Sequence, residues 1–152
     1  MKITKYLKLS QISIDIVVQD KNSVIQALIK ILVEQGQVPG DMAEDVISAV
    51  LERESLTSTG LGSGVALPHV KTDAVKQICI AFGRSKPGVE FEALDGNPVN
   101  FFFLILAPTK ATDDYLRILS SISGLMKKEA VRTQLLEAKS AEEMHRILDQ
   151  PV

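Results

Sequence analysis

The stretch Pro98–Pro108, PVNFFFLILAP, is the most apolar segment of the chain. A strand with one solvated face alternates apolar and polar residues, whereas this run is almost continuously apolar. Such a run is typical of a strand that is covered on both faces of its sheet. It is far shorter than the ~20 residues that a membrane-spanning helix needs. The stretch therefore predicts a buried strand with other elements packed on both sides.

Segments with apolar residues at helical spacing precede and follow this strand in the sequence. Before it, apolar residues recur at three- and four-residue steps up to Gly36, and Asp20 or Asn22 would cap the start of that helix. The order of elements is helices, a sheet and then helices, which predicts an α/β sandwich with helices on both sheet faces. The predicted helices are residues 21–36, 40–55, 113–128, 129–138 and 140–150, and the other predicted strands are residues 13–20, 64–70 and 77–86.

Local signals refine three of these helices. Asp41 and Glu44 have the spacing of a capping pair at the start of the second helix, and Ser140 with Glu143 forms a capping-box pattern before the last one. Thr112 or Asp113 would cap the third predicted helix. The expected buried stripe of that helix is Leu116, Leu119, Ile122 and Met126.

Composition excludes several classes of protein. The chain has 152 residues and a formal net charge of -2, which favours one domain (residues 1–152) and argues against a nucleic-acid partner. Its single cysteine, Cys79, excludes an internal disulfide and a cysteine-based zinc site, and we expect a buried thiol. The basic N-terminal stretch lacks the apolar core of a signal peptide. We therefore expect a cytoplasmic protein without direct membrane insertion.

A glycine-rich stretch, Ser58–Val70 (STGLGSGVALPHV), precedes one of the two histidines. Its G-x-G-x-G spacing before a strand is neither a dinucleotide fingerprint nor a P-loop, which argues against a nucleotide cofactor. Glycines at alternate positions let backbone N–H groups converge on an anion, and short hydroxyl side chains add donors. The candidate phosphate-binding residues are Ser58, Thr59, Gly60, Gly62, Ser63 and Gly64.

His69 ends this stretch, and Pro68 restricts the backbone just before it. A neutral imidazole is a nucleophile near neutral pH, so His69 is a candidate phosphoryl acceptor. Arg53, at the end of the predicted helix 40–55, has the planar fork that suits phosphate oxygens. From the residues alone, a structural histidine beside an ordinary bend remains an equal alternative. His145 fits a surface contact with Asp149, and the two histidines have no metal-ligand spacing, so no metal is expected.

The segment LERESLTSTGLGSGVALPHVK (residues 51–71) resembles the enzyme IIA domain of bacterial sugar phosphotransferase systems, mannitol/fructose type, which includes nitrogen-regulatory IIA proteins. The match to the family pattern runs from Arg53 to His69, and later segments are also similar. The resemblance implies a mixed sheet flanked by helices on both faces. It implies that His69 accepts a phosphoryl group from a histidine-containing phosphocarrier protein, and that Arg53 stabilises it. The group would pass to an enzyme IIB domain or serve as a regulatory signal.

One position departs from the family pattern. The family usually has a second histidine at the start of the helix after the apolar strand, and Tyr115 stands there in this chain. A tyrosine donates a hydrogen bond but carries no positive charge at neutral pH. The sequence therefore allows an alternative, a regulatory protein-binding module with weakened or lost phosphotransfer. The lack of IIB or IIC segments in this sequence favours the nitrogen-regulatory branch or a separate IIA subunit.

Overall fold

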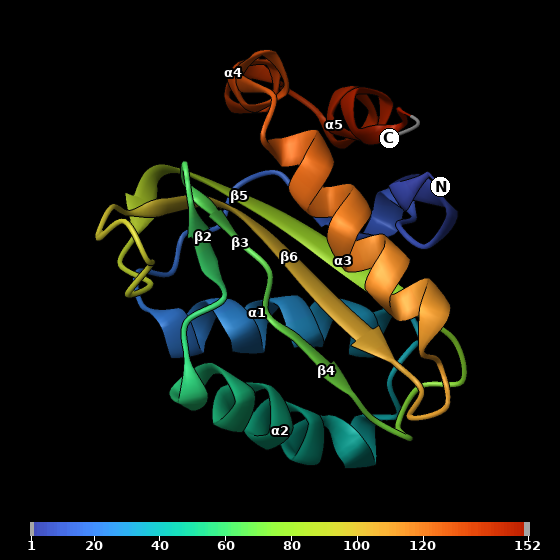
Figure 1. Cartoon of the computed structure of the whole chain (residues 1–152). Coiled ribbons are helices and arrows are strands. Elements are labelled where there is room, and N and C mark those ends of the chain that lie inside the picture. The colour runs from blue at the N-terminus through green and yellow to red at the C-terminus, as the bar shows by residue number, and fades with distance from the viewer. Residues whose placement is uncertain (1, 151–152) are drawn as a thin grey trace.

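The computed structural model describes residues 2–150. These residues form a single α/β domain with one six-stranded mixed sheet, which confirms the fold class expected from the sequence. Helices cover both faces of the sheet, with α1 and α2 on one side and α3, α4 and α5 on the other (Figure 1). In chain order the strands are β1 (Ile12–Ser13), β2 (Gly60–Gly62), β3 (Val65–Ala66), β4 (His69–Lys71), β5 (Cys79–Val89) and β6 (Val99–Ala107).

The apolar stretch 98–108 forms β6, which lies inside the sheet as predicted. It pairs antiparallel with β5 on one side and parallel with both β3 and β4 on the other. Alternate β6 side chains enter two separate cores, since Phe101, Phe103 and Ile105 belong to one cluster and Phe102 and Leu104 belong to the other. This two-sided burial explains the continuous apolar run.

The helices begin and end close to the predicted positions. Asp20 caps α1 by accepting a hydrogen bond from the Ser23 N–H at 2.8 Å, and Gly36 follows the helix with a φ of 74°. Ser140 accepts from the Glu143 N–H at the start of α5, as the capping box predicts. The helices are α1 (Lys21–Glu34), α2 (Ala43–Leu56), α3 (Asp113–Met126), α4 (Glu129–Glu137) and α5 (Ala141–Leu148), with short 3-10 turns at Ile3–Lys5, Leu9–Gln11 and Gly40–Met42.

Several local predictions are wrong. Residues 13–20 are not one strand: β1 ends at Ser13, although the Ile16 N–H still donates to the Arg84 carbonyl of β5 at 2.7 Å. Helix α2 begins after a 3-10 turn with Met42 as its N-cap, and within residues 2–150 no side chain caps it, so the expected Asp41 and Glu44 capping pair does not form.

The buried face of α3 also differs from the predicted stripe. Leu116 is 60% exposed, whereas its neighbour Tyr115 is buried together with Ile118, Ile122 and Leu125. Ile122 and Met126 are buried as predicted, so the apolar face is rotated only in part, toward Tyr115 and Ile118, whose spacing also satisfies the helical period. This rotation turns Tyr115 toward the sheet and leaves Leu116 in solvent.

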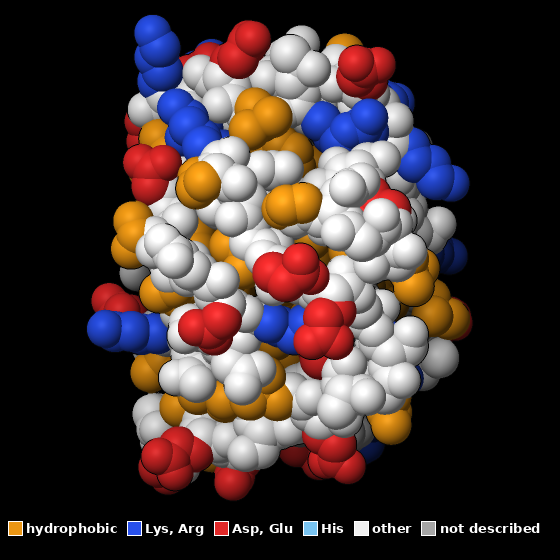
Figure 2. Space-filling view, turned by 90° about the vertical axis from the view of Figure 1, so that its left-hand side faces the viewer, with side chains coloured by type: hydrophobic (Ala, Val, Ile, Leu, Met, Phe, Trp, Pro, Cys, Tyr) orange, Lys and Arg blue, Asp and Glu red, His pale blue; other side chains and the backbone are white. Residues whose placement is uncertain are grey.

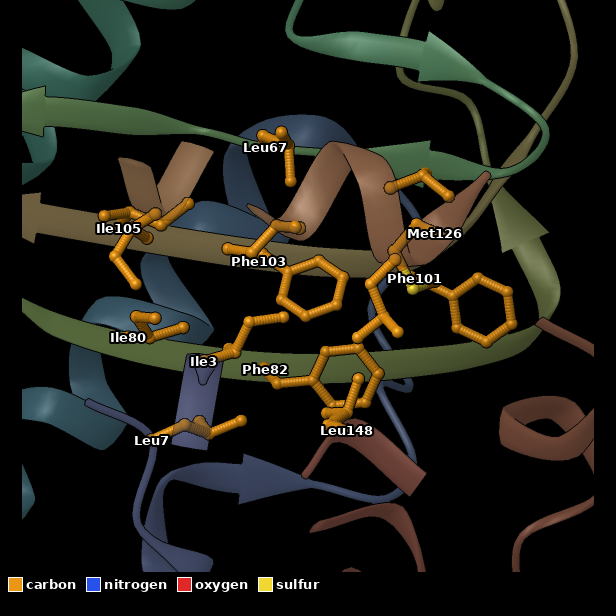
Figure 3. Packing of buried hydrophobic residues seen from close by; sticks show 14 of the residues in the cluster. Ile3, Leu7, Leu67, Ile80, Phe82, Phe101, Phe103, Ile105, Met126 and Leu148 are labelled. Atoms are coloured by element: carbon orange, nitrogen blue, oxygen red, sulfur yellow. The ribbon is translucent and has the colours of Figure 1, made fainter. Parts of the chain in front are cut away.

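One core cluster fixes the chain just before His69. Leu67 is 4% exposed and packs in the cluster that contains Phe103 and Ile105 of β6 (Figure 3). Pro68 then separates β3 from β4, and its carbonyl accepts a hydrogen bond from the Ile105 N–H at 2.9 Å. The side chain before Pro68 and the backbone of Pro68 are therefore both anchored, which restricts the position of the next residue.

Candidate functional site

His69 lies where the edge of the sheet changes from one strand to another. The β2–β3 hairpin covers this edge as far as Ala66, and β4 then continues the pairing with β6. His69 lies opposite Ile105 of β6 and is partly buried. In Figure 1, β4 runs across the front between α2 and α3.

The imidazole of His69 is oriented by the backbone. Its Nδ1 atom lies 2.6 Å from the carbonyl oxygen of Leu67. A carbonyl oxygen only accepts hydrogen bonds, so the neutral ring carries its proton on Nδ1 when this contact is made. The lone pair is then on Nε2, the nitrogen on the far side of the ring. This geometry makes Nε2 the nucleophilic atom of the site.

The surroundings of His69 favour its neutral form. Burial lowers the pKa of His69 below its usual 6.5, because desolvation disfavours the charged ring, and the Arg53 guanidinium lowers it further. The Leu67 carbonyl and the Glu54 carboxylate oppose this shift without cancelling it. A neutral, nucleophilic imidazole is therefore present at neutral pH.

Arg53 extends from the last turns of α2. Its Nη1 donates a hydrogen bond to the carbonyl oxygen of Thr57 at 3.1 Å, which leaves the remaining donors of the fork for other partners. The guanidinium charge acts on both residues: it adds to the burial that lowers the pKa of His69, and it offsets part of the burial that raises the pKa of Tyr115. The structure thus brings together Arg53, His69 and Tyr115, three residues that the sequence singled out.

A buried carboxylate stands behind the site. Glu54 is 4% exposed, and it accepts hydrogen bonds from both the backbone N–H and the hydroxyl of Thr59. It also pairs with the Lys21 ammonium at 3.2 Å, and that ammonium lies 4.9 Å from the centre of the Phe91 ring. Figure 2 shows the face where α1 begins and α2 ends, with acidic side chains around a basic one. This network, Lys21–Glu54–Thr59, joins α1, α2 and the segment before β2.

The network continues through the backbone to the histidine. The Thr59 carbonyl accepts a hydrogen bond from the Leu67 N–H at 3.1 Å, and the Leu67 carbonyl contacts Nδ1 of His69. The conformation of the turn that Glu54 holds is therefore coupled to the orientation of the imidazole. Sequence reasoning had used Glu54 only as part of the family pattern; its burial depends on tertiary packing.

The hydroxyls expected to bind phosphate are already engaged. Ser58 donates to the Phe91 carbonyl at 3.1 Å and accepts from the Gly60 N–H at 3.0 Å, while the Thr59 hydroxyl donates to Glu54. Gly60 pairs with Ala66 in the hairpin. Ser58, Thr59 and Gly60 thus shape the chain around the site through their own internal bonds.

The structure does not bring Gly62, Ser63 and Gly64 to His69. They form the hairpin turn with positive φ values of 95°, 57° and 77°, so a left-handed turn is present as the glycines suggested. Its anion, however, is a side chain of the protein: the Ser63 N–H donates to Oδ2 of Asp95 at 3.1 Å.

The sheet register separates this turn from the histidine. Val65, the first residue after the turn, lies opposite Phe101, whereas His69 lies opposite Ile105. Four residues of strand correspond to about 13 Å. The turn is therefore beyond contact with the imidazole, and a phosphate on His69 needs other donors.

Tyr115 closes the site from α3. Its ring meets the His69 ring edge-on, with centroids 5.9 Å apart and an interplanar angle of 62°. Burial raises the pKa of Tyr115 to about 12, so the phenol is neutral at neutral pH. The residue at this position therefore offers a ring and a hydroxyl but no charge.

One residue beside the site was missed by sequence reasoning. Lys71 is exposed and lies in β4, and its ammonium is 5.4 Å from the centre of the Tyr115 ring. The signal that could have found it is the His-x-Lys spacing, because residues two apart in a strand share a face.

Other candidate groups lie outside the site. His145 contacts the carbonyl oxygen of Leu7 through Nε2 at 3.1 Å, where α5 packs against the N-terminal turns, and it also lies near Asp149, its predicted partner. Cys79 is buried as expected, and burial raises the pKa of its thiol to about 12. Residues 2–150 contain no cluster of three or more histidine, cysteine or acidic side chains suited to a metal ion. Within the same range, no helix is long and apolar enough to cross a membrane.

Residues 5–150 match the family described as phosphoenolpyruvate-dependent sugar phosphotransferase system, EIIA 2. The chain belongs to this family. EIIA components are phosphohistidine phosphotransfer proteins. The family resemblance inferred from the histidine motif is thereby confirmed, over almost the whole chain.

Two curated relatives are fructose-specific. The fructose-specific EIIA component of Haloferax volcanii is 39% identical over 132 residues, covering 87% of this chain and 84% of that protein. The fructose-specific EIIABC component of Bacillus subtilis is 41% identical over 150 residues, covering 99% of this chain. The chain spans only 23% of the length of the Bacillus protein.

Solved structures support the same family. The nitrogen-regulatory protein IIA-Ntr of Neisseria meningitidis has 37% identity and a TM-score of 0.88, with 96% of this chain and 98% of that chain covered. The mannitol enzyme IIA of Escherichia coli, solved in complex with phosphorylated enzyme IIB, has 24% identity and a TM-score of 0.78, with 93% and 97% covered. That second likeness shows the shared fold. The chain is thus an EIIA phosphocarrier related to both the fructose and the nitrogen-regulatory branches.

Proposed function

We propose that His69 is the phosphoryl acceptor of this EIIA protein and that Nε2 is the reacting atom. The observation that supports this best is the 2.6 Å contact between Nδ1 and the Leu67 carbonyl oxygen, which leaves the Nε2 lone pair free. In the transfer step, Nε2 attacks phosphorus while the N–P bond of the donor breaks and its electron pair returns to the donor imidazole. The ring of His69 becomes positively charged, and the Leu67 carbonyl accepts a stronger, charge-assisted hydrogen bond.

Arg53 would hold the transferred group. Its guanidinium lies close enough to lower the pKa of His69, and only one of its hydrogen bonds goes to the Thr57 carbonyl. A guanidinium fork matches phosphate oxygens and stays charged at all relevant pH values. Tyr115 would add a neutral hydrogen-bond donor beside the ring. The backbone around Ser58, Thr59 and Gly60 would act by holding Leu67 in place.

We propose a histidine-containing phosphocarrier protein as the donor and an enzyme IIB domain or a regulatory target as the acceptor. The solved complex of mannitol enzyme IIA with phosphorylated enzyme IIB supports a IIB partner by analogy of fold. Leu56 at the end of α2 is 78% exposed and Leu116 on α3 is 60% exposed. These helices flank β4, so the two side chains would give partners an apolar contact beside His69. The proposal keeps the cytoplasmic location expected from the sequence.

Incubation with a phosphorylated carrier protein tests this function. Wild type should gain one acid-labile phosphate, and His69→Ala should gain none by intact-mass measurement. NMR of the phosphorylated protein should place phosphorus on Nε2. Phosphate on another residue, or on Nδ1 of His69, would contradict the proposal.

A second candidate function follows from Tyr115. Because a neutral phenol stands beside His69, phosphotransfer could be weakened and the chain would act as a regulatory module through protein contacts. Affinity capture with wild type, His69→Ala and His69→Asp distinguishes the two functions. The same set of partners for all three proteins favours the binding module, whereas partners that differ with the charge at residue 69 favour a phosphorylation switch.

A further inference from the structure

Three side chains form a row at the site: His69, Tyr115 and Lys71. His69 and Lys71 are two residues apart in β4, so they emerge on the same face of the strand. The Tyr115 ring contacts the His69 ring edge-on at 5.9 Å, and the Lys71 ammonium lies 5.4 Å from the centre of that Tyr115 ring. Lys71, the only cation of these three side chains, is therefore separated from the imidazole by the Tyr115 ring.

The ammonium of Lys71 is held weakly in this position. Lys71 is exposed, and a cation–π contact at an exposed site is a weak interaction. Within residues 2–150, no carboxylate forms an ion pair with Lys71. A flexible four-carbon stem lets the ammonium move, and a phosphoryl dianion would be a stronger partner than a ring.

The charges around His69 leave room for a second cation. A phosphoryl group carries about -1.5 to -2 charge at neutral pH. The Arg53 guanidinium and the phosphorylated ring each carry one positive charge, while the Glu54 carboxylate is paired with Lys21 and Tyr115 is neutral. Of these groups only Arg53 is a charged donor for the phosphoryl oxygens, so acceptor positions remain for a second cation. Lys71 lies on β4 with its ammonium over the Tyr115 ring of α3, so it approaches from a different element than Arg53.

We propose that Lys71 is a phosphate-binding residue of the phosphorylated protein, held ready on the Tyr115 ring until His69 is phosphorylated. This inference rests on the proposed role of His69 as phosphoryl acceptor. After transfer, the Lys71 ammonium leaves the ring and pairs with phosphoryl oxygens, while the Tyr115 hydroxyl remains a neutral donor. Lys71 and Tyr115 together then provide one charge and one hydrogen bond beside the imidazole.

The test compares Lys71→Met with Lys71→Arg and with Lys76→Met as a matched control. Lys76 is also exposed, but it lies beside Gly36 and Gln37 near the end of α1. The measurements are the rate of phosphorylation by a phosphorylated carrier protein and the pKa of the phosphoryl group by ³¹P NMR titration. A purely structural role of Lys71 would not move the phosphoryl pKa.

Lys71→Met should raise the phosphoryl pKa by roughly half a unit, the size of one unscreened charge contact in water. It should slow phosphorylation about three- to tenfold, an effect that shrinks at high salt. Lys71→Arg should keep the phosphoryl pKa and the rate of phosphorylation close to those of wild type, and Lys76→Met should match wild type in both measurements. If Lys71→Met equals wild type while wild type is phosphorylated on His69, the Lys71 proposal is overturned. If wild-type His69 takes no phosphate, the proposed function itself fails.

Discussion

Replacing Glu54 by alanine should destabilise the protein far more than a typical helix substitution. The variant removes the acceptor of the Thr59 N–H and hydroxyl and leaves the Lys21 ammonium without its carboxylate. Breaking a buried pair by removing one partner costs about 3–5 kcal/mol. Lys21 keeps some contact with water, with its side chain 17% exposed, which places the expected loss near the lower value, about 3 kcal/mol. For a domain of this size, that loss lowers Tm by roughly 6–12 °C.

Urea and thermal unfolding followed by circular dichroism measure this loss. The matched control is Glu52→Ala, an exposed carboxylate on the same helix, which should stay within about 0.5 kcal/mol of wild type. Glu54→Gln should fall between, because an amide oxygen still accepts from Thr59 but does not pair with Lys21. A Glu54→Ala protein as stable as Glu52→Ala would refute the inferred network.

The same variant tests the coupling to the histidine. Glu54 holds Thr59, whose carbonyl accepts from the Leu67 N–H, and the Leu67 carbonyl orients Nδ1 of His69. In wild type, ¹⁵N NMR should show the neutral ring protonated on Nδ1. In folded Glu54→Ala, the Nε2-protonated form should become detectable. An unchanged tautomer would mean that Leu67 is held by the core alone.

Three further outcomes are expected. An NMR titration should show a pKa of His69 below its usual 6.5. The contribution of His69 to the free energy of unfolding is then fully present above pH 6.5 and is lost as the pH falls toward the lowered pKa. His69→Gln should remove this part of the pH dependence of stability. Arg84→Met should lower the free energy of unfolding in urea by about 3 kcal/mol, because the buried guanidinium donates to the Leu135 and Ala138 carbonyls at the end of α4. A loss below about 1 kcal/mol would show that these carbonyls find other donors. Gly60→Ala should lower the free energy of unfolding by about 1–3 kcal/mol, since the new Cβ would lie 2.8 Å from the Ala93 Cα. Gly40→Ala should lower it far less, because a Cβ at Gly40 would meet open space.

The sequence by itself determined most of the helices, the central strand and the family. The apolar run of β6 predicted its two-sided burial, because a strand between two helical layers needs apolar residues at nearly every position. Apolar spacing with Asp20 and Ser140 as caps located α1 and α5, since those signals act within one turn of helix. The motif from Arg53 to His69 indicated the family that the comparison over residues 5–150 shows.

Only the tertiary structure decided what surrounds the imidazole. Gly62, Ser63 and Gly64 do form a left-handed turn, but the sheet register places this turn beside the far part of β6 from His69. The Ser63 N–H in the turn donates to the carboxylate of Asp95. Lys71 shares the face of His69 through the strand period and meets Tyr115 only because α3 is rotated to bury that ring. Local sequence signals specify backbone conformation within a few residues, whereas these contacts join segments that are far apart in the chain. Their partners are therefore fixed by packing and register.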